Sequence, residues 1–186
     1  MRLFLERGIE GVSIDDLTSA AKMAKGGFYR YFADKEALVA ALLEPAKREM
    51  EGAFARCGEG LATAKGREEM FAAYREVGAA LAVLVLEHPD VLRLYLQECR
   101  GPAVGARRPV RALAAKVALE AVALTQVVHA RKLFRPIHPA VSALAVVGAS
   151  ERLLLAVLAE EEVGNPLQIP EALIGIILEG IRARER

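Results

Sequence analysis

The strongest constraint on the fold is that no stretch of the 186 residues alternates apolar and polar side chains for long enough to form a strand. Ala and Leu number 34 and 25, whereas the turn-favouring residues Asp and Asn number 4 and 1. Hydrophobic residues make up 54% of the chain, which is enough for a packed core. We therefore predict an all-α fold of about nine helices.

Composition and spacing also exclude several classes of protein. Cys57 and Cys99 are too few for a disulfide scaffold, so we expect two buried thiols in the cytoplasm, with a redox pair as the alternative. The longest uninterrupted apolar run, residues 77–86, is too short to cross a bilayer. No basic segment is followed by an apolar one as in a signal peptide, so we expect none. We therefore expect no membrane partner.

Enzyme chemistry has little support in the sequence. No acidic residue or cysteine stands at metal-ligand spacing from any of the three histidines. Ser142 and Ser150 fall inside predicted helices rather than in a nucleophile elbow, and there is no glycine-rich phosphate loop. We expect no catalytic residues, no metal and no cofactor.

Capping residues, glycines and prolines mark the helix boundaries. Ser13, with Asp16 three residues on, predicts a capping box, and Asp34 is a strong N-cap for a long helix. Pro45 predicts a kink or an early break in that helix, and Gly58 and Gly60 predict a turn after it. The expected helices cover residues 2–7, 14–21, 25–31, 35–56, 66–87, 90–100, 109–133, 139–161 and 170–186.

The short helices at the start carry the clearest functional signal. Residues 14–21 and 25–31, joined by a three-residue turn, have the spacing of a helix-turn-helix. Met23 in the turn is apolar and is expected to fill the core beneath it. Phe28 and Phe32 stand four apart, on one face of the second helix.

Residues 3–43 resemble the DNA-binding domain of the TetR family of bacterial repressors, most specifically in the segment KGGFYRYFADKEAL at 25–38. The family's signature is Lys-Gly, a small residue, an apolar residue, Tyr, a variable residue, His or Tyr, Phe, then Lys-Glu and Leu. The resemblance implies a helix-turn-helix DNA-binding domain over 1–44 and a ligand-binding and dimerisation domain over 45–186. It implies a ligand-responsive transcriptional regulator, a repressor by expectation, which binds a near-palindromic operator as a homodimer.

The resemblance also implies that eight residues bind operator DNA. Phenol, ammonium and hydroxyl donors suit backbone phosphates, and the start of the second helix enters the major groove, where an arginine can reach a guanine edge. The residues expected to hold phosphates are Ser13, Tyr29, Tyr31 and Lys35. Those expected at the major groove are Lys25, Gly26, Gly27 and Arg30.

The sequence departs from the family pattern at several positions. Lys22 stands where the turn usually has Gly and is expected to take a positive φ, Ala24 replaces the usual N-cap Ser, and Gly27 replaces a Thr or Ser. The chain begins inside the first helix, so its N-terminus is expected to be shortened. These departures support an alternative, a helical small-molecule-binding or dimerising protein that has lost specific DNA binding.

The segment 139–159 is apolar nearly all round, so it must be buried on two sides. The second side is most simply covered by a partner subunit, and the alternative is a central core helix in a monomer. Close helix approach would explain Gly148 in mid-helix. The resemblance implies a four-helix dimer interface made by the last two helices of each subunit. The expected interface residues are Val141, Leu144, Gly148, Leu155, Leu173 and Ile177.

The resemblance places an effector chamber among the middle helices, and their large soft side chains suit a mostly apolar ligand. The same stripe at Phe71 and Tyr74 could instead be ordinary core, and Gln126 with His129 could be a satisfied buried pair. The role of the cluster Arg100, Arg107, Arg108 and Arg111 stays open between a solvated loop, an anion site and a lid. The expected lining residues are Met50, Phe54, Met70, Phe71, Tyr74, Leu94, Tyr95, Cys99, Gln126 and His129.

Overall fold

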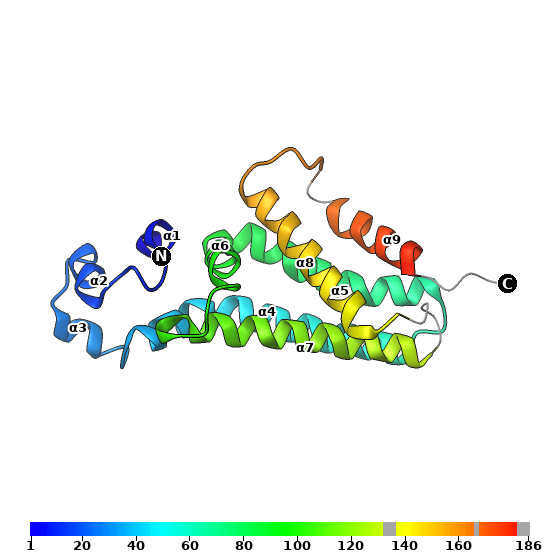
Figure 1. Cartoon of the computed structure of the whole chain (residues 1–186), viewed down its shortest axis with the longest axis horizontal. Helices are drawn as coiled ribbons and strands as arrows, with labels where there is room; N and C mark the ends of the chain where they lie inside the picture. Colours follow the sequence, from blue (N-terminus) through cyan, green and yellow to red (C-terminus); the bar gives the residue numbers. More distant parts are fainter. Residues whose placement is uncertain (132–136, 166–167, 182–186) are drawn as a thin grey trace. The chain divides into compact units, whose positions relative to one another are not determined.

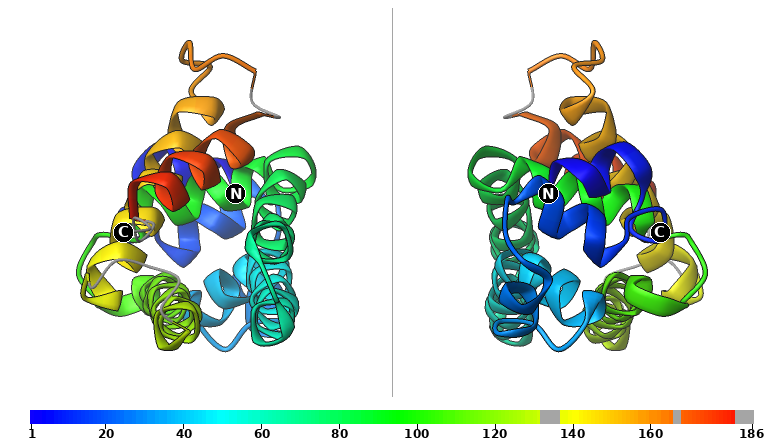
Figure 2. Two further views of the ribbon diagram at one scale, coloured as in Figure 1. Left: turned by 90° about the vertical axis from the view of Figure 1, so that its right-hand side faces the viewer. Right: turned by 90° about the vertical axis from the view of Figure 1, so that its left-hand side faces the viewer.

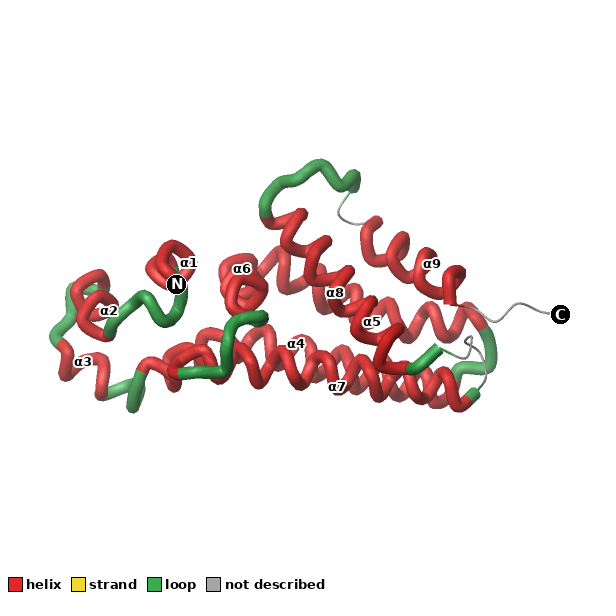
Figure 3. The backbone as a smooth tube through the Cα atoms, viewed as in Figure 1, coloured by secondary structure: helices red, strands yellow, loops and turns green. Residues whose placement is uncertain are grey.

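The computed structural model describes residues 1–131, 137–165 and 168–181, and the side chains of 67 and 177–181 lie outside that description. Within it every regular element is helical, which confirms the all-α prediction (Figures 1 and 3). The described helices are α1 Arg2–Arg7, α2 Ile14–Ala20, α3 Lys25–Tyr29, α4 Lys35–Thr63, α5 Arg67–Glu87, α6 Pro89–Glu98, α7 Arg108–Ala130, α8 Pro139–Leu158 and α9 Ile169–Ile181. A single turn of 3-10 helix, η1, covers Gly105–Arg107.

The chain divides into two compact units. The first unit contains Met1–Lys47 and His88–Ala115, and the second contains Arg48–Glu87 and Lys116–Arg186. In this division α6 and the start of α7 group with the N-terminal helices, whereas the predicted domains were the continuous segments 1–44 and 45–186. A segment that is distant along the chain, His88–Ala115, therefore belongs to the same compact unit as the helix-turn-helix.

The core of the first unit forms where α1, α4, α6 and α7 meet. Phe4 from α1, Val39 from α4, Leu94 from α6 and Val110 from α7 are all fully buried, and Ile9 from the turn after α1 joins them. Helix α1 packs against α6, and α2 packs against α3. The start of α4 is capped as predicted, because the Asp34 carboxylate accepts a hydrogen bond from the backbone N–H of Ala37 at 2.8 Å.

The second unit is built mainly by apolar packing. Leu61 of α4, Leu84 of α5 and Val128 of α7 are fully buried, and α9 packs against both α5 and α8. The end-on views show α8 and α9 lying against one another (Figure 2). On the surface of this unit, Lys116 of α7 pairs with Glu51 of α4 at 2.5 Å.

Helix α4 is longer than predicted, and the expected turn at Gly58 and Gly60 is wrong. The helix continues through Pro45 to Thr63. A Cβ at Gly60 would lie only 2.9 Å from Cβ of Ala73, so this glycine lets α5 approach α4 closely. Close helix packing, rather than a turn, explains the glycine here.

Other helix boundaries also differ from prediction. Helix α6 begins at Pro89, with His88 as its N-cap, one residue before the expected start at residue 90. Helix α8 ends at Leu158, before the expected end near residue 161. The expected end of the helix over 109–133 falls in 132–136, outside the described residues.

Candidate nucleic-acid interface

The helix-turn-helix begins with the predicted capping box. The Ser13 hydroxyl accepts from the Asp16 backbone N–H at 3.1 Å, and the Asp16 carboxylate accepts from the Ser13 backbone N–H at 2.8 Å. The hydrogen bond from the Ser13 hydroxyl, followed by that from the Ser13 backbone and by Arg7, holds the pKa of Asp16 well below its usual range. This stabilisation is therefore present above the ordinary Asp pKa of about 3.9 and is lost as pH falls from there.

The turn between α2 and α3 carries the predicted backbone strain. Lys22 has φ 53°, a left-handed conformation that costs a residue with a side chain roughly 1 kcal/mol. Ala24 is the N-cap of α3 and makes no side-chain capping bond. Met23 does not fill the core as predicted, because it is 38% exposed and its Cε packs over Gly27 instead.

Helix α3 buries one aromatic ring and exposes others. Phe28 is buried, with its ring centroid 5.7 Å from that of Phe32 and 5.5 Å from that of Tyr29. Tyr29 is 50% exposed and Tyr31 is 72% exposed. Nothing lies within 4 Å of a Cβ built at Gly26. Of the predicted DNA-binding residues in this segment, Lys25, Gly26, Tyr29, Arg30 and Tyr31 are therefore exposed, whereas Gly27 is half-buried beneath Met23.

Lys25 is engaged with a residue that sequence reasoning missed. Its ammonium lies 2.7 Å from the Asp15 carboxylate on α2, and both side chains are more than half exposed. The hydrogen bond to Asp15 raises the pKa of Lys25. The pairing partly neutralises the positive charge at the start of α3. The sequence pattern identified the first turn of α2 only as part of a helix cap. Asp15 stands ten residues before Lys25, and this spacing does not by itself predict an ion pair.

Lys35 has a structural role that the sequence did not predict. Its ammonium donates to the carbonyl oxygens of Ile9 and Val12, each at 2.8 Å. An ammonium has three donors, so one is left for the predicted phosphate contact. The lysine therefore ties the start of α4 to the turn between α1 and α2.

The residues expected to line an effector chamber belong to both units. Met50, Phe54 and Met70 are buried, whereas Gln126 is exposed and His129 is half-buried, so the predicted polar pair does not share one environment. Those in the second unit are Met50, Phe54, Met70, Phe71, Tyr74, Gln126 and His129. Those in the first unit, all buried, are Leu94, Tyr95 and Cys99.

Cys57 is fully buried in the second unit, and Tyr74, like Phe71, is half-buried there. Burial, with a smaller contribution from Glu76, raises the pKa of the Cys57 thiol to about 12. Burial and then Cys57 raise the pKa of the Tyr74 hydroxyl. Cys57 and Cys99 are both buried free thiols, as predicted.

One face of α8 is apolar and is not covered by the other residues that the structure describes. Val141 is 61% exposed, Leu144 51% and Leu155 46%, and a Cβ at Gly148 would meet nothing within 4 Å. These residues recur at helical spacing, while Ser142, Ala143, Ala156 and Leu158 on other sides of the helix are buried. Leu173 of α9 is half-buried, and the side chain of Ile177 lies outside the described residues.

Two helices, Gly105–Ala130 and Pro139–Leu158, are long and apolar enough to cross a membrane by length and composition alone. Length and composition alone are weak evidence for a membrane span, because the core helices of soluble proteins meet the same criteria. Among the described residues, His, Cys, Asp and Glu side chains form no group of three that could hold a metal ion.

Comparison with known sequences points to the N-terminal helices. Residues 1–42 match the family model of the bacterial regulatory proteins of the tetR family. The HTH-type transcriptional repressor DhaR of Mycobacterium sp. (strain GP1) is 44% identical over 43 residues, which are 23% of this chain and 22% of DhaR. The uncharacterized HTH-type transcriptional regulator YuxN of Bacillus subtilis (strain 168) is 30% identical over 98 residues, which are 53% of this chain and 32% of YuxN. The chain thus matches a third or less of the length of these curated relatives.

Comparison with solved structures covers nearly the whole chain. The ketosteroid transcriptional regulator KstR2 of Mycobacterium tuberculosis has a TM-score of 0.66 at 19% identity, covering 98% of this chain and 91% of that one. The fatty acid degradation regulator FadR of Bacillus halodurans has a TM-score of 0.70 at 13% identity, covering 97% and 95%. AibR in complex with isovaleryl coenzyme A and operator DNA has a TM-score of 0.62 at 21% identity, covering 94% and 91%. At these identities the likeness establishes a shared fold.

Proposed function

We propose that the chain is a TetR-family regulator, a ligand-responsive transcriptional repressor that binds a near-palindromic operator as a homodimer in the cytoplasm. The match of residues 1–42 to the tetR family model and the shared fold over nearly the whole chain support this proposal. The observation that carries the proposal is that Lys25 and Tyr29 of α3, with Arg30 and Tyr31 directly after it, are all exposed. Phenol and cationic donors next to an open helix start match what a DNA backbone and groove accept. Regulators of this family are transcription factors and not enzymes.

The uncovered face of α8 supports the homodimer. Its apolar residues repeat along the helix around Gly148, where nothing blocks a second helix. A twofold axis would bring the same face of two copies together, burying both apolar stripes at once. We propose that α8 and α9 supply this interface, so that the two helix-turn-helix segments read two half-sites.

The apolar interior supports a mostly apolar effector. Met50, Phe54 and Met70 are large, adaptable side chains buried in the second unit. AibR, which shares the fold, was solved with isovaleryl coenzyme A, and acyl compounds are therefore the first class to test. An effector that binds one conformer of the dimer better than the other would shift the population away from the DNA-binding form.

The alternative function, a ligand-binding or dimerising protein without specific DNA binding, is favoured by three features of the same surface. They are the strained Lys22, the missing cap at Ala24 and the pairing of Lys25 with Asp15. Each weakens or neutralises a part of the helix-turn-helix.

One experiment separates the two functions. The full chain is used to select duplexes from a random library, and the affinities for selected and random DNA are then compared across salt concentrations. A repressor binds the selected duplex tighter by about three orders of magnitude or more. Equal affinity for both duplexes would favour the alternative. Tyr29→Phe should weaken both duplexes alike, whereas Arg30→Ala should relax preference at one base position by about 1–3 kcal/mol.

A further inference from the structure

Glu98, the last residue of α6, is a buried carboxylate to which the proposed function assigns no role. Its side chain is 5% exposed. One carboxylate oxygen accepts from the backbone N–H of Ile9 at 3.0 Å, and the other accepts from Nε of Arg107 at 2.5 Å. The Arg107 side chain is itself only 16% exposed. A buried charge is tolerated when it is paired and hydrogen-bonded, and here both oxygens are used.

The turn between α1 and α2, residues 8–12, has a backbone that only glycine permits at two positions. Gly8 has φ 73°, and a Cβ there would also lie 3.1 Å from the Glu98 carboxylate. A Cβ at Gly11 would lie 2.3 Å from the carbonyl oxygen of Arg7. The two glycines let the turn pass close to its neighbours, and they present the Ile9 N–H to Glu98.

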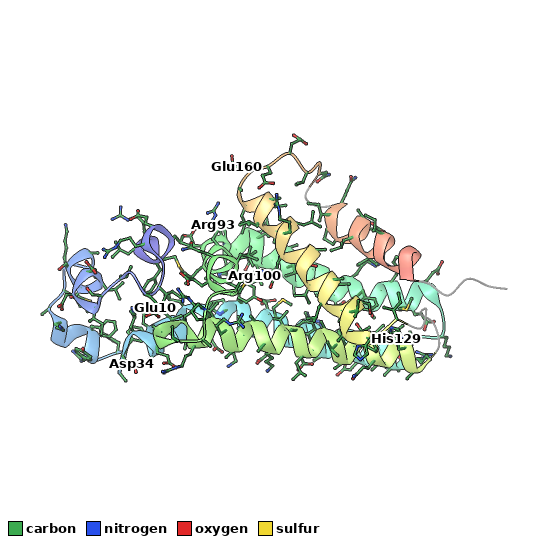
Figure 4. All side chains as sticks on the ribbon, viewed as in Figure 1. Glu10, Asp34, Arg93, Arg100, His129 and Glu160 are labelled. Carbon is green, nitrogen blue, oxygen red and sulfur yellow. The ribbon has the colours of Figure 1, made fainter. Side chains whose placement is uncertain are left out.

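A second carboxylate joins the same turn to η1. Glu10, labelled in Figure 4, accepts from the backbone N–H of Arg107 at 3.2 Å. Its carboxylate lies so close to Gly105 that a Cβ there would be 2.8 Å away. Residue 107 is therefore bound twice, through its side chain to Glu98 and through its backbone to Glu10. We call Glu10, Glu98 and Arg107 the anchor.

The anchor gives part of the arginine cluster a role. Arg108 pairs with Glu36 of α4 at 2.9 Å, and Arg111 donates to the carbonyl oxygen of Cys99. The positive charges of Arg107 and Arg108 are thus neutralised within the first unit. These contacts favour a structural connection over the anion site or the lid that the sequence left open.

We propose that the anchor fixes the orientation of the helix-turn-helix relative to α6, with Glu98 as its positioning residue. The proposal rests on the proposed DNA-binding function. Binding to two half-sites requires each recognition helix to be held at a set angle and spacing. Helix α2 begins directly after the anchored turn, so the bond from Ile9 to Glu98 restrains α2 and α3 together.

The test uses Glu98→Gln in the full chain. An amide has one oxygen where a carboxylate has two, so either the Ile9 N–H or the Arg107 Nε–H loses its acceptor. We expect affinity for a full palindromic site, selected by the wild-type chain from a random library, to fall by at least about tenfold. Affinity for a single half-site and for random duplex should stay within about twofold, because the residues on α3 are unchanged.

A matched control and a milder variant accompany it. Glu51→Gln opens the exposed pair with Lys116 in the second unit and should leave all three affinities unchanged. Glu10→Ala removes an exposed acceptor, so the chain still folds, and it should reproduce the selective loss on the full site to a smaller extent. Hydrogen exchange should be faster at residues 8–13 in both anchor variants than in the control.

The outcomes distinguish an orienting role for Glu98 from a purely stabilising one. Equal losses on the full site and the half-site would mean that Glu98 only stabilises the recognition surface, and would overturn the proposal. Unchanged full-site affinity with unchanged exchange at residues 8–13 would overturn it as well. If the wild-type chain shows no sequence preference, the proposed function fails, and the exchange measurement alone then decides whether the anchor holds the turn.

Discussion

Both units have an apolar core, but among the described residues only the first unit also buries a charged side chain. In the first unit, buried hydrogen bonds join segments far apart in sequence, as between Ile9 and Glu98. In the second, apolar side chains such as Leu61, Leu84 and Val128 fill the core, and α8 leaves an apolar face uncovered. Hydrogen bonds are directional and fix an angle, whereas apolar burial is not and tolerates a new partner or ligand. The difference matches the two proposed roles. The first unit orients the recognition helix, and the second unit binds a partner subunit and an effector.

The largest effect, on the oligomeric state, is expected from a substitution in the uncovered face of α8. Gly148→Arg places a cation in the proposed helix contact, which would cost several kcal/mol if the dimer formed around it. Light scattering should therefore show a monomer or an aggregate. Gly66→Arg is the matched control, since a side chain there also meets open space, and it should leave the dimer intact. A stable dimer of Gly148→Arg would place the interface elsewhere.

The next effect sharpens the contrast between buried and exposed ion pairs. Glu98→Gln leaves the Arg107 cation without its buried partner, and the free energy of unfolding should fall by about 3 kcal/mol in urea denaturation. Glu161→Gln removes the exposed ion pair with Arg152 in the second unit. This substitution should change the free energy of unfolding by less than about 1 kcal/mol. Similar losses in both variants would contradict the distinction drawn between the two units.

A smaller gain is expected from relieving strain in the helix-turn-helix. Lys22 occupies the left-handed region, which glycine adopts without cost, so Lys22→Gly should raise the free energy of unfolding by roughly 1 kcal/mol. Urea denaturation measures the change. The control is Lys65→Gly, outside the strained turn, for which no gain is expected. A destabilised Lys22→Gly would mean that the lysine side chain has a stabilising contact of its own.

The smallest effect concerns the exposed pair on the recognition surface. Asp15→Asn frees Lys25 for phosphate, so affinity for random DNA should rise by a few-fold at low salt, with a steeper salt dependence by about one unit. Fluorescence anisotropy across a salt series gives both quantities. Asp90→Asn removes an acid from α6, outside the helix-turn-helix, and serves as the charge-matched control. Unchanged binding by Asp15→Asn would show that Lys25 does not contact DNA.

Much of the local structure could be predicted because its causes lie within a few residues. The capping box at Ser13 and Asp16 and the end of α1 at Gly8 each depend on contacts at most four positions apart. The positive φ of Lys22 was instead predicted from the resemblance, because the family usually has Gly at that position. The error at Gly60 has the opposite origin. Considered with its sequence neighbours alone, a glycine predicts a turn. Only the close approach of Ala73 from α5 explains why a glycine stands within a helix here.

The all-α class, the helix-turn-helix and its exposed aromatic and basic residues follow from the sequence alone, because helix periodicity and capping act over short distances. The packing of the helices instead decides which partners the charged side chains have. The packing pairs Lys25 with Asp15, turns Lys35 inward to Ile9, and buries Glu98 between Ile9 and Arg107. Ile9 and Glu98 stand 89 positions apart, and no local pattern encodes that meeting. Their bond requires α1 to pack against α6, which is a property of the whole first unit.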